Sequence, residues 1–133
     1  HQTGCIDMDY SQLSDFEINR MIGDVIFKGL WACKPETSGN DTSKWYYGNA
    51  DATFEPLNPL PDYCNDWSAT GPIIVDNEIS LNSYGSAWEA SFEHDAPIGA
   101  FGADETVTSG YEHRNPLRAA MIAFLMKREH SNA

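Results

Sequence analysis

Near the start of the chain, apolar residues recur at helical spacing directly after a capping signal. Ser14 and Glu17 have the spacing of a capping box, in which each side chain accepts a hydrogen bond from the other residue's backbone amide. From residue 18 to residue 26 the apolar positions fall three and four apart, and Gly29 is a typical stop signal. The pattern predicts a helix with one face toward the core.

The last apolar segment predicts a second helix, with Asn115 as its cap and Pro116 as its first residue. Five positions form one apolar stripe: Leu117, Ala120, Met121, Phe124 and Leu125. Ile122 and Met126 lie beside this stripe, so a second surface is needed to bury them. A homodimer through this helix is one alternative, and coverage by residues 31–56 is the other.

Between these helices, apolar and polar residues alternate with the period of a half-buried strand. Residues 88–93 place aromatic side chains on one face and acids on the other, and residues 79–81 alternate in the same way. A turn-rich segment joins them, which predicts an antiparallel hairpin over about residues 79–93. Residues 94–114 predict a long loop with one short strand near its middle. The predicted fold class is α+β, a small antiparallel sheet packed with N- and C-terminal helices.

The predicted domain organisation is a single domain over residues 8–133. Residues 1–7 are expected to be a leader or a remnant outside the native chain, because Met8 directly precedes the first helix signal. Residues 31–61 are rich in turn formers and are predicted to be a loop-rich insertion. Its aromatic side chains form either a satellite core or an interface patch, and they are Trp31, Trp45, Tyr46 and Tyr47.

Charge is distributed unevenly along the chain. The 69 residues from Trp45 to His113 contain 12 Asp and Glu but no Lys or Arg, and all eight basic residues lie elsewhere. A formal net charge of -12 disfavours direct binding to nucleic acid or to an anionic membrane surface. The acidic part of the chain must therefore present carboxylates to water, to a metal ion or to a basic partner.

The candidate binding residues are six carboxylates and one arginine. If the carboxylates share one surface without Lys or Arg partners, they could imitate the phosphates of DNA, which carries about one charge per ~1.7 Å of axis. Arg118 lies one turn into the apolar helix, so it must pair with a carboxylate or contact a partner. The set is Glu89, Glu93, Asp95, Asp104, Glu105, Glu112 and Arg118.

A metal-dependent enzyme is the alternative from another functional class. His94 and His113, with the acids near them, offer imidazole and carboxylate donors suited to zinc or manganese. The sequence contains neither H-E-x-x-H nor any nucleophile-elbow or phosphate-loop motif. We therefore expect a protein that is not an enzyme and that holds no metal or cofactor.

The cysteines and the apolar runs indicate the cellular compartment of the protein. The three cysteines are widely spaced and form no C-x-x-C pair, which disfavours a disulfide framework. Neither a signal peptide nor an apolar run of ~18 residues, as a membrane-spanning helix requires, is present. The sequence predicts a cytoplasmic location.

Several blocks of the chain form a recognisable series. The most specific block is residues 115–122, Asn-Pro-Leu-Arg-Ala-Ala-Met-Ile, and the others are residues 8–19, 63–67, 71–74, 79–81 and 88–90. In type and order these blocks resemble the NinX-type family of small lambdoid-phage and prophage proteins, whereas residues 31–56 fit the family pattern poorly. The resemblance implies a phage origin and a fold in which helices flank a small antiparallel sheet, but it implies no activity.

Charge and resemblance together predict a phage accessory protein that acts by binding another protein. The partner is a host or phage protein, and the sharper hypothesis is a DNA mimic that inhibits a nucleic-acid-binding or defence protein in the host cytoplasm. The alternatives are a self-associating structural module and the metal-dependent enzyme.

Overall fold

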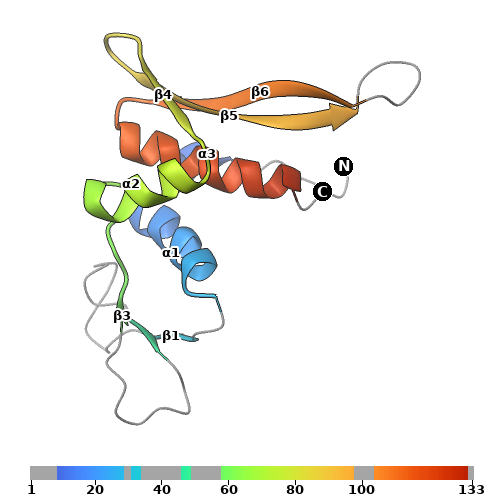
Figure 1. Cartoon of the computed structure of the whole chain (residues 1–133). Coiled ribbons are helices and arrows are strands. Elements are labelled where there is room, and N and C mark those ends of the chain that lie inside the picture. The colour runs from blue at the N-terminus through green and yellow to red at the C-terminus, as the bar shows by residue number, and fades with distance from the viewer. Residues whose placement is uncertain (1–8, 29–30, 34–45, 49–57, 98–103, 132–133) are drawn as a thin grey trace.

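The computed structural model describes residues 9–28, 31–33, 46–48, 58–97 and 104–131 (Figure 1). Predictions made for residues 1–7 and for most of residues 31–61 lie outside these ranges. After a 3-10 turn over Tyr10–Gln12, the helices are α1 (Asp15–Ile26), α2 (Trp67–Asp76) and α3 (Pro116–Ser131). The α+β class is confirmed.

Both predicted helix caps are present. The Ser14 hydroxyl accepts a hydrogen bond from the Glu17 amide at 3.1 Å, and the Glu17 carboxylate accepts one from the Ser14 amide at 2.8 Å. At the start of α3, the Asn115 side-chain oxygen accepts from the Leu117 amide at 2.9 Å. These bonds satisfy amide groups that lack a partner within the helix, so the local sequence determines where α1 and α3 begin.

Helix α2 continues through Pro72. A residue before proline is normally excluded from the helical region by contact between its Cβ atom and the proline ring. Gly71 precedes Pro72 and has no Cβ atom, so the helix passes this point. Asp66 caps α2 by accepting a hydrogen bond from the Ser68 amide at 3.0 Å.

The larger sheet has three antiparallel strands in the order β4 (Ser80–Ser83), β5 (Trp88–Pro97) and β6 (Asp104–His113). The predicted β4–β5 hairpin is confirmed, whereas the long loop predicted over residues 94–114 is wrong. Ten consecutive residue pairs join β5 to β6, from Trp88 with His113 to Pro97 with Asp104. Pairing with a long neighbouring strand overrides the weak local preference of this glycine-containing segment.

The smaller sheet consists of β1 (Trp31–Cys33), β2 (Tyr46–Gly48) and β3 (Asn58–Pro59), in that order. Tyr47 is 1% exposed, and its ring stacks on Phe27 of the segment after α1 with centroids 4.7 Å apart. The aromatic residues of this segment were predicted to form either a satellite core or an interface patch, and Tyr47 belongs to the core.

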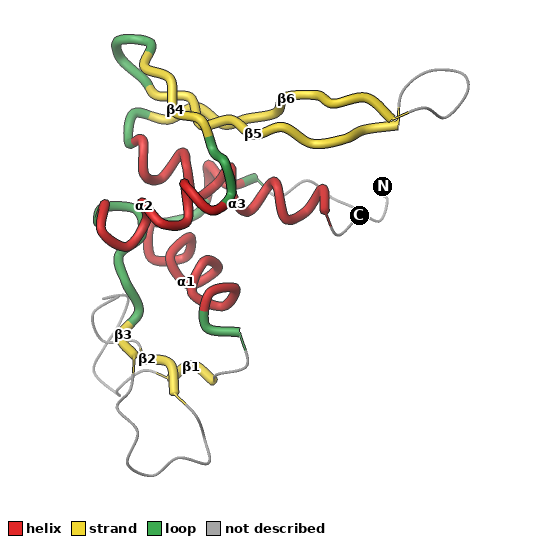
Figure 2. Tube along the Cα trace, viewed as in Figure 1, coloured by secondary structure: helices red, strands yellow, loops and turns green. Residues whose placement is uncertain are grey.

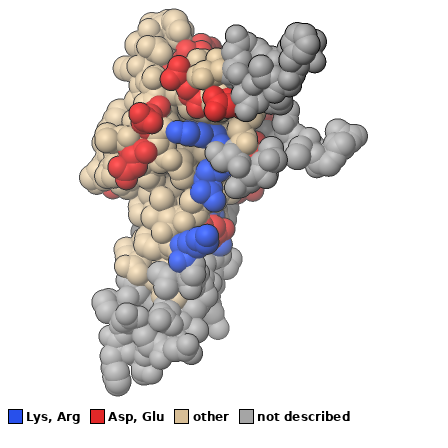
Figure 3. Space-filling view, turned by 45° about the vertical axis from the view of Figure 1, so that its right-hand side comes forward, with Lys and Arg blue, Asp and Glu red and all other residues tan. Residues whose placement is uncertain are grey.

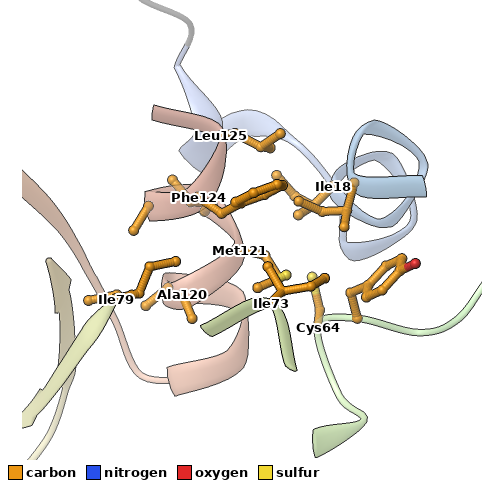
Figure 4. Close-up of a cluster of buried hydrophobic side chains, with 14 of the residues drawn as sticks. Ile18, Cys64, Ile73, Ile79, Ala120, Met121, Phe124 and Leu125 are labelled. Atoms are coloured by element: carbon orange, nitrogen blue, oxygen red, sulfur yellow. The ribbon is translucent and has the colours of Figure 1, made fainter. Parts of the chain in front are cut away.

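The elements form layers around α3, which lies between the larger sheet and the pair α1 and α2 (Figures 1 and 2). The smaller sheet lies at the opposite end of the molecule from the larger one (Figure 2). In the core, Phe124 and Met121 of α3 face Ile18 of α1 and Ile73 of α2 (Figure 4).

The position of α3 supplies the second burial surface for this helix within a single chain. Ile122 is fully buried within the single chain, and Met126 packs against the same apolar cluster. The larger sheet supplies much of the second burial surface, because α3 contacts β4, β5 and β6 as well as α1 and α2. A homodimer is therefore not required to bury Ile122, because β6 extends the sheet beyond the predicted hairpin.

Candidate binding surface

One face of the larger sheet points away from α3, and we call it the outer face. Along β5, Ala90 and Phe92 are buried against the helices, so the alternate residues Glu89, Glu93 and Asp95 belong to the outer face. On β6, Glu112 is paired directly with Glu89 and lies on the same face. We call Glu89, Glu93, Asp95 and Glu112 the outer carboxylates.

The pairing of Glu89 with Glu112 brings two like charges together. Directly opposed residues of antiparallel strands have Cβ atoms about 4.5–5.5 Å apart, and like charges at that separation destabilise the sheet. The Tyr84 hydroxyl donates a hydrogen bond to Glu89 Oε1 at 3.2 Å. The negative charges of Glu89 and Glu112 raise the pKa of Tyr84 above its usual value, so a neutral donor faces this acidic pair.

Glu93 and Asp95 extend the acidic surface toward the far end of the hairpin, and both are exposed. Their partners on β6 are Thr108 and Thr106, and the Thr106 hydroxyl donates to Asp95 Oδ1 at 3.1 Å. Among the described residues, no Lys or Arg forms a salt bridge with any outer carboxylate. Hydroxyl groups are therefore their observed hydrogen-bond donors.

The register gives the strand positions of two other predicted binding residues. Asp104 is paired with Pro97 and Glu105 with Ala96 at the far end of the hairpin. The side chains of Asp104 and Glu105 lie outside the described part of the structure, so the expectation that all six carboxylates share one surface stays a prediction for these two residues.

Basic side chains lie mainly on the helical part of the molecule. In Figure 3 they run in a short column below the acidic side chains, which gather toward the sheet. Arg20 Nη2 lies 3.2 Å from Asp24 Oδ1, and Lys127 donates a hydrogen bond to the Asn77 carbonyl at 2.6 Å. Acidic side chains also lie beside the basic ones on the helical part, where Arg20 and Arg118 have carboxylate partners, whereas the outer carboxylates have none among the described residues.

Arg118 has a structural environment. Its guanidinium lies 2.7 Å from Asp15 Oδ1 and donates hydrogen bonds to the carbonyl oxygens of Tyr10 and Leu13, and the residue is 7% exposed. These bonds hold the segment before α1 against α3. Of the two alternatives for Arg118, the structure shows the internal ion pair.

The two histidines on which the alternative of a metal-dependent enzyme depends do not meet. His113 is paired with Trp88, six residues along β5 from His94, which corresponds to about 20 Å. His94 Nε2 lies 2.8 Å from Ser109 Oγ, and the His94 ring stacks on His130 with centroids 4.0 Å apart. In the described part of the chain, no group of three or more His, Cys, Asp or Glu side chains could hold a metal ion. His94 and His113 lie far apart along one hairpin, so the structure does not bring together the ligands of that alternative.

A polar cluster that sequence reasoning did not identify joins the helices. Asn19 is fully buried, donates to Asp62 Oδ1 at 2.8 Å and accepts from the Cys64 amide at 3.0 Å. Asn115 Nδ2 donates to the Cys64 carbonyl at 2.7 Å. Burial raises the pKa of the Cys64 thiol, so it remains protonated and unreactive. The cluster positions residues 62–66 between α1 and α3. Its one signal in the sequence was Asn19, a polar residue within a predicted helix.

A second cluster attaches the smaller sheet to α1. The Tyr47 hydroxyl donates to Asp24 Oδ1 at 2.9 Å and accepts from Arg20 Nε at 3.2 Å. Burial, together with the bond to Asp24, raises the pKa of Tyr47 to about 12. Gly23 provides the space for this ring, because a Cβ atom there would lie 2.6 Å from Tyr47 Oη.

The fold and its outer face are those of a small acidic α+β protein built around one central helix. The chain matches the family model described as "Bacteriophage P22, NinX" over residues 9–128, and it therefore belongs to this family of phage proteins. The resemblance inferred from the sequence is confirmed. A comparison with curated proteins found no match. No helix in the described ranges combines the length and apolarity that crossing a membrane requires.

Proposed function

We propose that this phage accessory protein acts by binding a basic surface of another protein with its outer face, and that it is not an enzyme. The observation that carries the proposal is the direct pairing of Glu89 with Glu112, which have no salt-bridge partner among the described residues. Such a pair disfavours the folded sheet. A basic partner would supply the missing positive charge, because its Lys or Arg side chains can approach both carboxylates at once.

The sharper form of the proposal is mimicry of DNA toward a nucleic-acid-binding or defence protein in the host cytoplasm. From Glu89 to Asp95 the outer carboxylates extend over six residues of β5, or about 20 Å. Four charges over that length correspond to one per ~5 Å, compared with one per ~3.4 Å for a single DNA strand. The charge density of the outer face is therefore lower than that of a nucleic-acid strand but of the same order, which supports its binding in a groove that accepts such a strand.

Internal geometry supports binding over a metal-dependent enzyme. The separation of His94 from His113 is unfavourable to that alternative, which uses both histidines as ligands. Arg118 and the buried Cys64 take part in internal contacts. The outer face, in contrast, presents carboxylates that have no salt-bridge partner among the described residues.

Affinity capture from host lysate at low and high salt tests the proposal. Captured proteins should bind nucleic acid, should be displaced by added DNA, and should dissociate at high salt, because screening lengths fall from about 10 Å at 0.1 M to about 3 Å at 1 M. The double variant Glu93→Gln with Asp95→Asn should lose at least about tenfold in affinity for the captured protein.

The matched control is Asp76→Asn with Glu78→Gln, which removes the same charge from two exposed residues outside the larger sheet. This variant should bind the partner nearly as well as the unmodified protein. Equal losses in both variants, or capture that neither salt nor DNA affects, would refute the proposal.

A further inference from the structure

Strand β6 forms one edge of the larger sheet, with β5 as its only neighbour in the described part of the structure. Ten residues from Asp104 to His113 pair one-to-one with β5, without a bulge. In such a strand, every second residue directs its N–H and C=O groups away from the neighbouring strand. The outer side of β6 therefore presents a row of backbone donors and acceptors to which another strand can bind.

This edge lacks several of the features that prevent strand addition. Natural edge strands are commonly protected by their short length, by charged residues, especially Lys, by Pro, or by a bulge. Strand β4 is a short edge of four residues, whereas β6 has ten residues and contains neither Lys nor Pro. The charged residues within β6 are acidic, so they oppose the addition of an acidic strand more than that of a basic one. Residues 106–108, Thr-Val-Thr, are favourable for an extended conformation.

We propose that β6 is the docking strand for the basic partner, which adds an extended segment with Lys or Arg at alternate positions. This inference rests on the proposed function and specifies how the partner binds. A strand placed beside β6 continues the outer face, so every second side chain lies next to Thr106, Thr108 and Glu112. Glu93 and Asp95 lie one strand further, about 5 Å beyond β6, within reach of a long basic side chain.

The other side chains of the added segment would lie on the face toward α3, beside the half-buried residues Val107 and Tyr111. Apolar or β-branched side chains suit these positions. The preferred ligand is therefore an extended peptide in which basic and β-branched residues alternate.

A second copy of this chain is a poorer occupant of the same edge. Each chain has a formal net charge of -12. Pairing two β6 strands would join their outer faces into one sheet, with the outer carboxylates of both copies on the same side. Like charges then repel across the new contact, whereas a basic segment is attracted to it.

Three synthetic peptides of equal length test the inference with the full chain. The first alternates Lys and Val, the second has the same composition with all Lys residues adjacent, and the third is the alternating peptide with N-methylated backbone amides. Strand addition needs both the alternation and the backbone donors, so the first peptide should bind at least about tenfold more tightly than the other two. It should also slow hydrogen exchange at the outward-facing amides of β6.

Two protein variants with the same change in charge provide the control. Thr108→Lys places a cation on β6, whereas Asn82→Lys places one on the outer face of β4. Thr108→Lys should weaken binding of the alternating peptide more than Asn82→Lys, because lysine protects an edge strand from addition.

The outcomes separate this inference from the proposed function. Equal affinity for all three peptides, or equal effects of both lysine variants, would overturn strand addition and leave an electrostatic surface. Failure of every peptide to bind at low salt would overturn the proposed function as well. Sedimentation of the protein alone is the remaining measurement, and a dimer that Thr108→Lys dissociates would show that a second copy occupies β6.

Discussion

Replacing Gly23 with alanine has two opposing effects on the free energy of unfolding. Alanine in a helix interior is favoured over glycine by about 0.5–1 kcal/mol, because glycine loses more backbone entropy. At this position, however, a Cβ atom would lie 2.6 Å from Tyr47 Oη and 2.7 Å from Leu60 Cδ1. Both neighbours are buried, at 1% and 2% exposure, so neither can move without disturbing its own contacts.

Overpacking of this kind costs about 1–3 kcal/mol, which exceeds the gain in helix propensity. We therefore expect Gly23→Ala to lower the free energy of unfolding by about 1 kcal/mol. Urea denaturation followed by circular dichroism measures this change. An unchanged slope of the unfolding free energy against urea concentration would show that the two proteins unfold in comparable transitions.

The double variant with Tyr47→Ala identifies the cause. Tyr47→Ala removes much of the obstruction. The loss in free energy of unfolding caused by Gly23→Ala should therefore be at least about 1 kcal/mol smaller in the Tyr47→Ala background than in the unmodified protein. Additive effects in this cycle would refute the reasoning, as would a stabilisation by Gly23→Ala alone. Either result would mean that residues 46–48 do not pack on α1 as the structure shows.

Three further predictions concern individual contacts. Arg118→Met should lower the free energy of unfolding by about 2 kcal/mol, because two backbone carbonyl groups lose a charged donor. It should also increase proteolytic cleavage before α1, and unchanged proteolysis would contradict this anchoring role. Burial, with the nearby positive charges of Arg118 and Arg114, lowers the pKa of His113 below its usual 6.5. The contribution of His113 to stability is therefore present above pH 6.5 and is lost as the pH falls through the folded-state pKa. Denaturation measured across this range should show a smaller loss for His113→Gln than for the unmodified protein, and identical pH profiles would refute the assignment. Gly110→Ala should destabilise the protein by about 1–3 kcal/mol in thermal or urea unfolding, because its Cβ atom would lie 2.5 Å from the Ala90 carbonyl oxygen, and a neutral effect would show that the two strands are further apart.

Local chemistry was sufficient to predict much of the fold. The starts of α1 and α3 follow from hydrogen bonds made by Ser14, Glu17 and Asn115 within a few residues of themselves. The β4–β5 hairpin follows from alternation and a turn. In each case the energetic preference arises between neighbours in the chain, so a single sequence reveals it.

Longer-range pairing accounts for the predictions that failed. Strand β6 contains glycine and charged residues, and it forms because β5 provides ten partners for it. Its register in turn places Glu112 directly opposite Glu89 and His113 far from His94. None of these relations is encoded by spacing within one segment, because they depend on which residues of another strand lie opposite.

The sequence by itself determined the segregation of charge, the helix caps and the membership of a phage protein family. Only the tertiary structure decided where that charge lies and which residues are occupied internally. It placed four carboxylates on one face of a sheet and enclosed Arg118 in an ion pair with Asp15. It also buried Ile122 beneath the sheet rather than against a second chain. The physical reason is that burial and charge pairing depend on which distant segments are brought together, whereas caps and alternation depend on nearest neighbours.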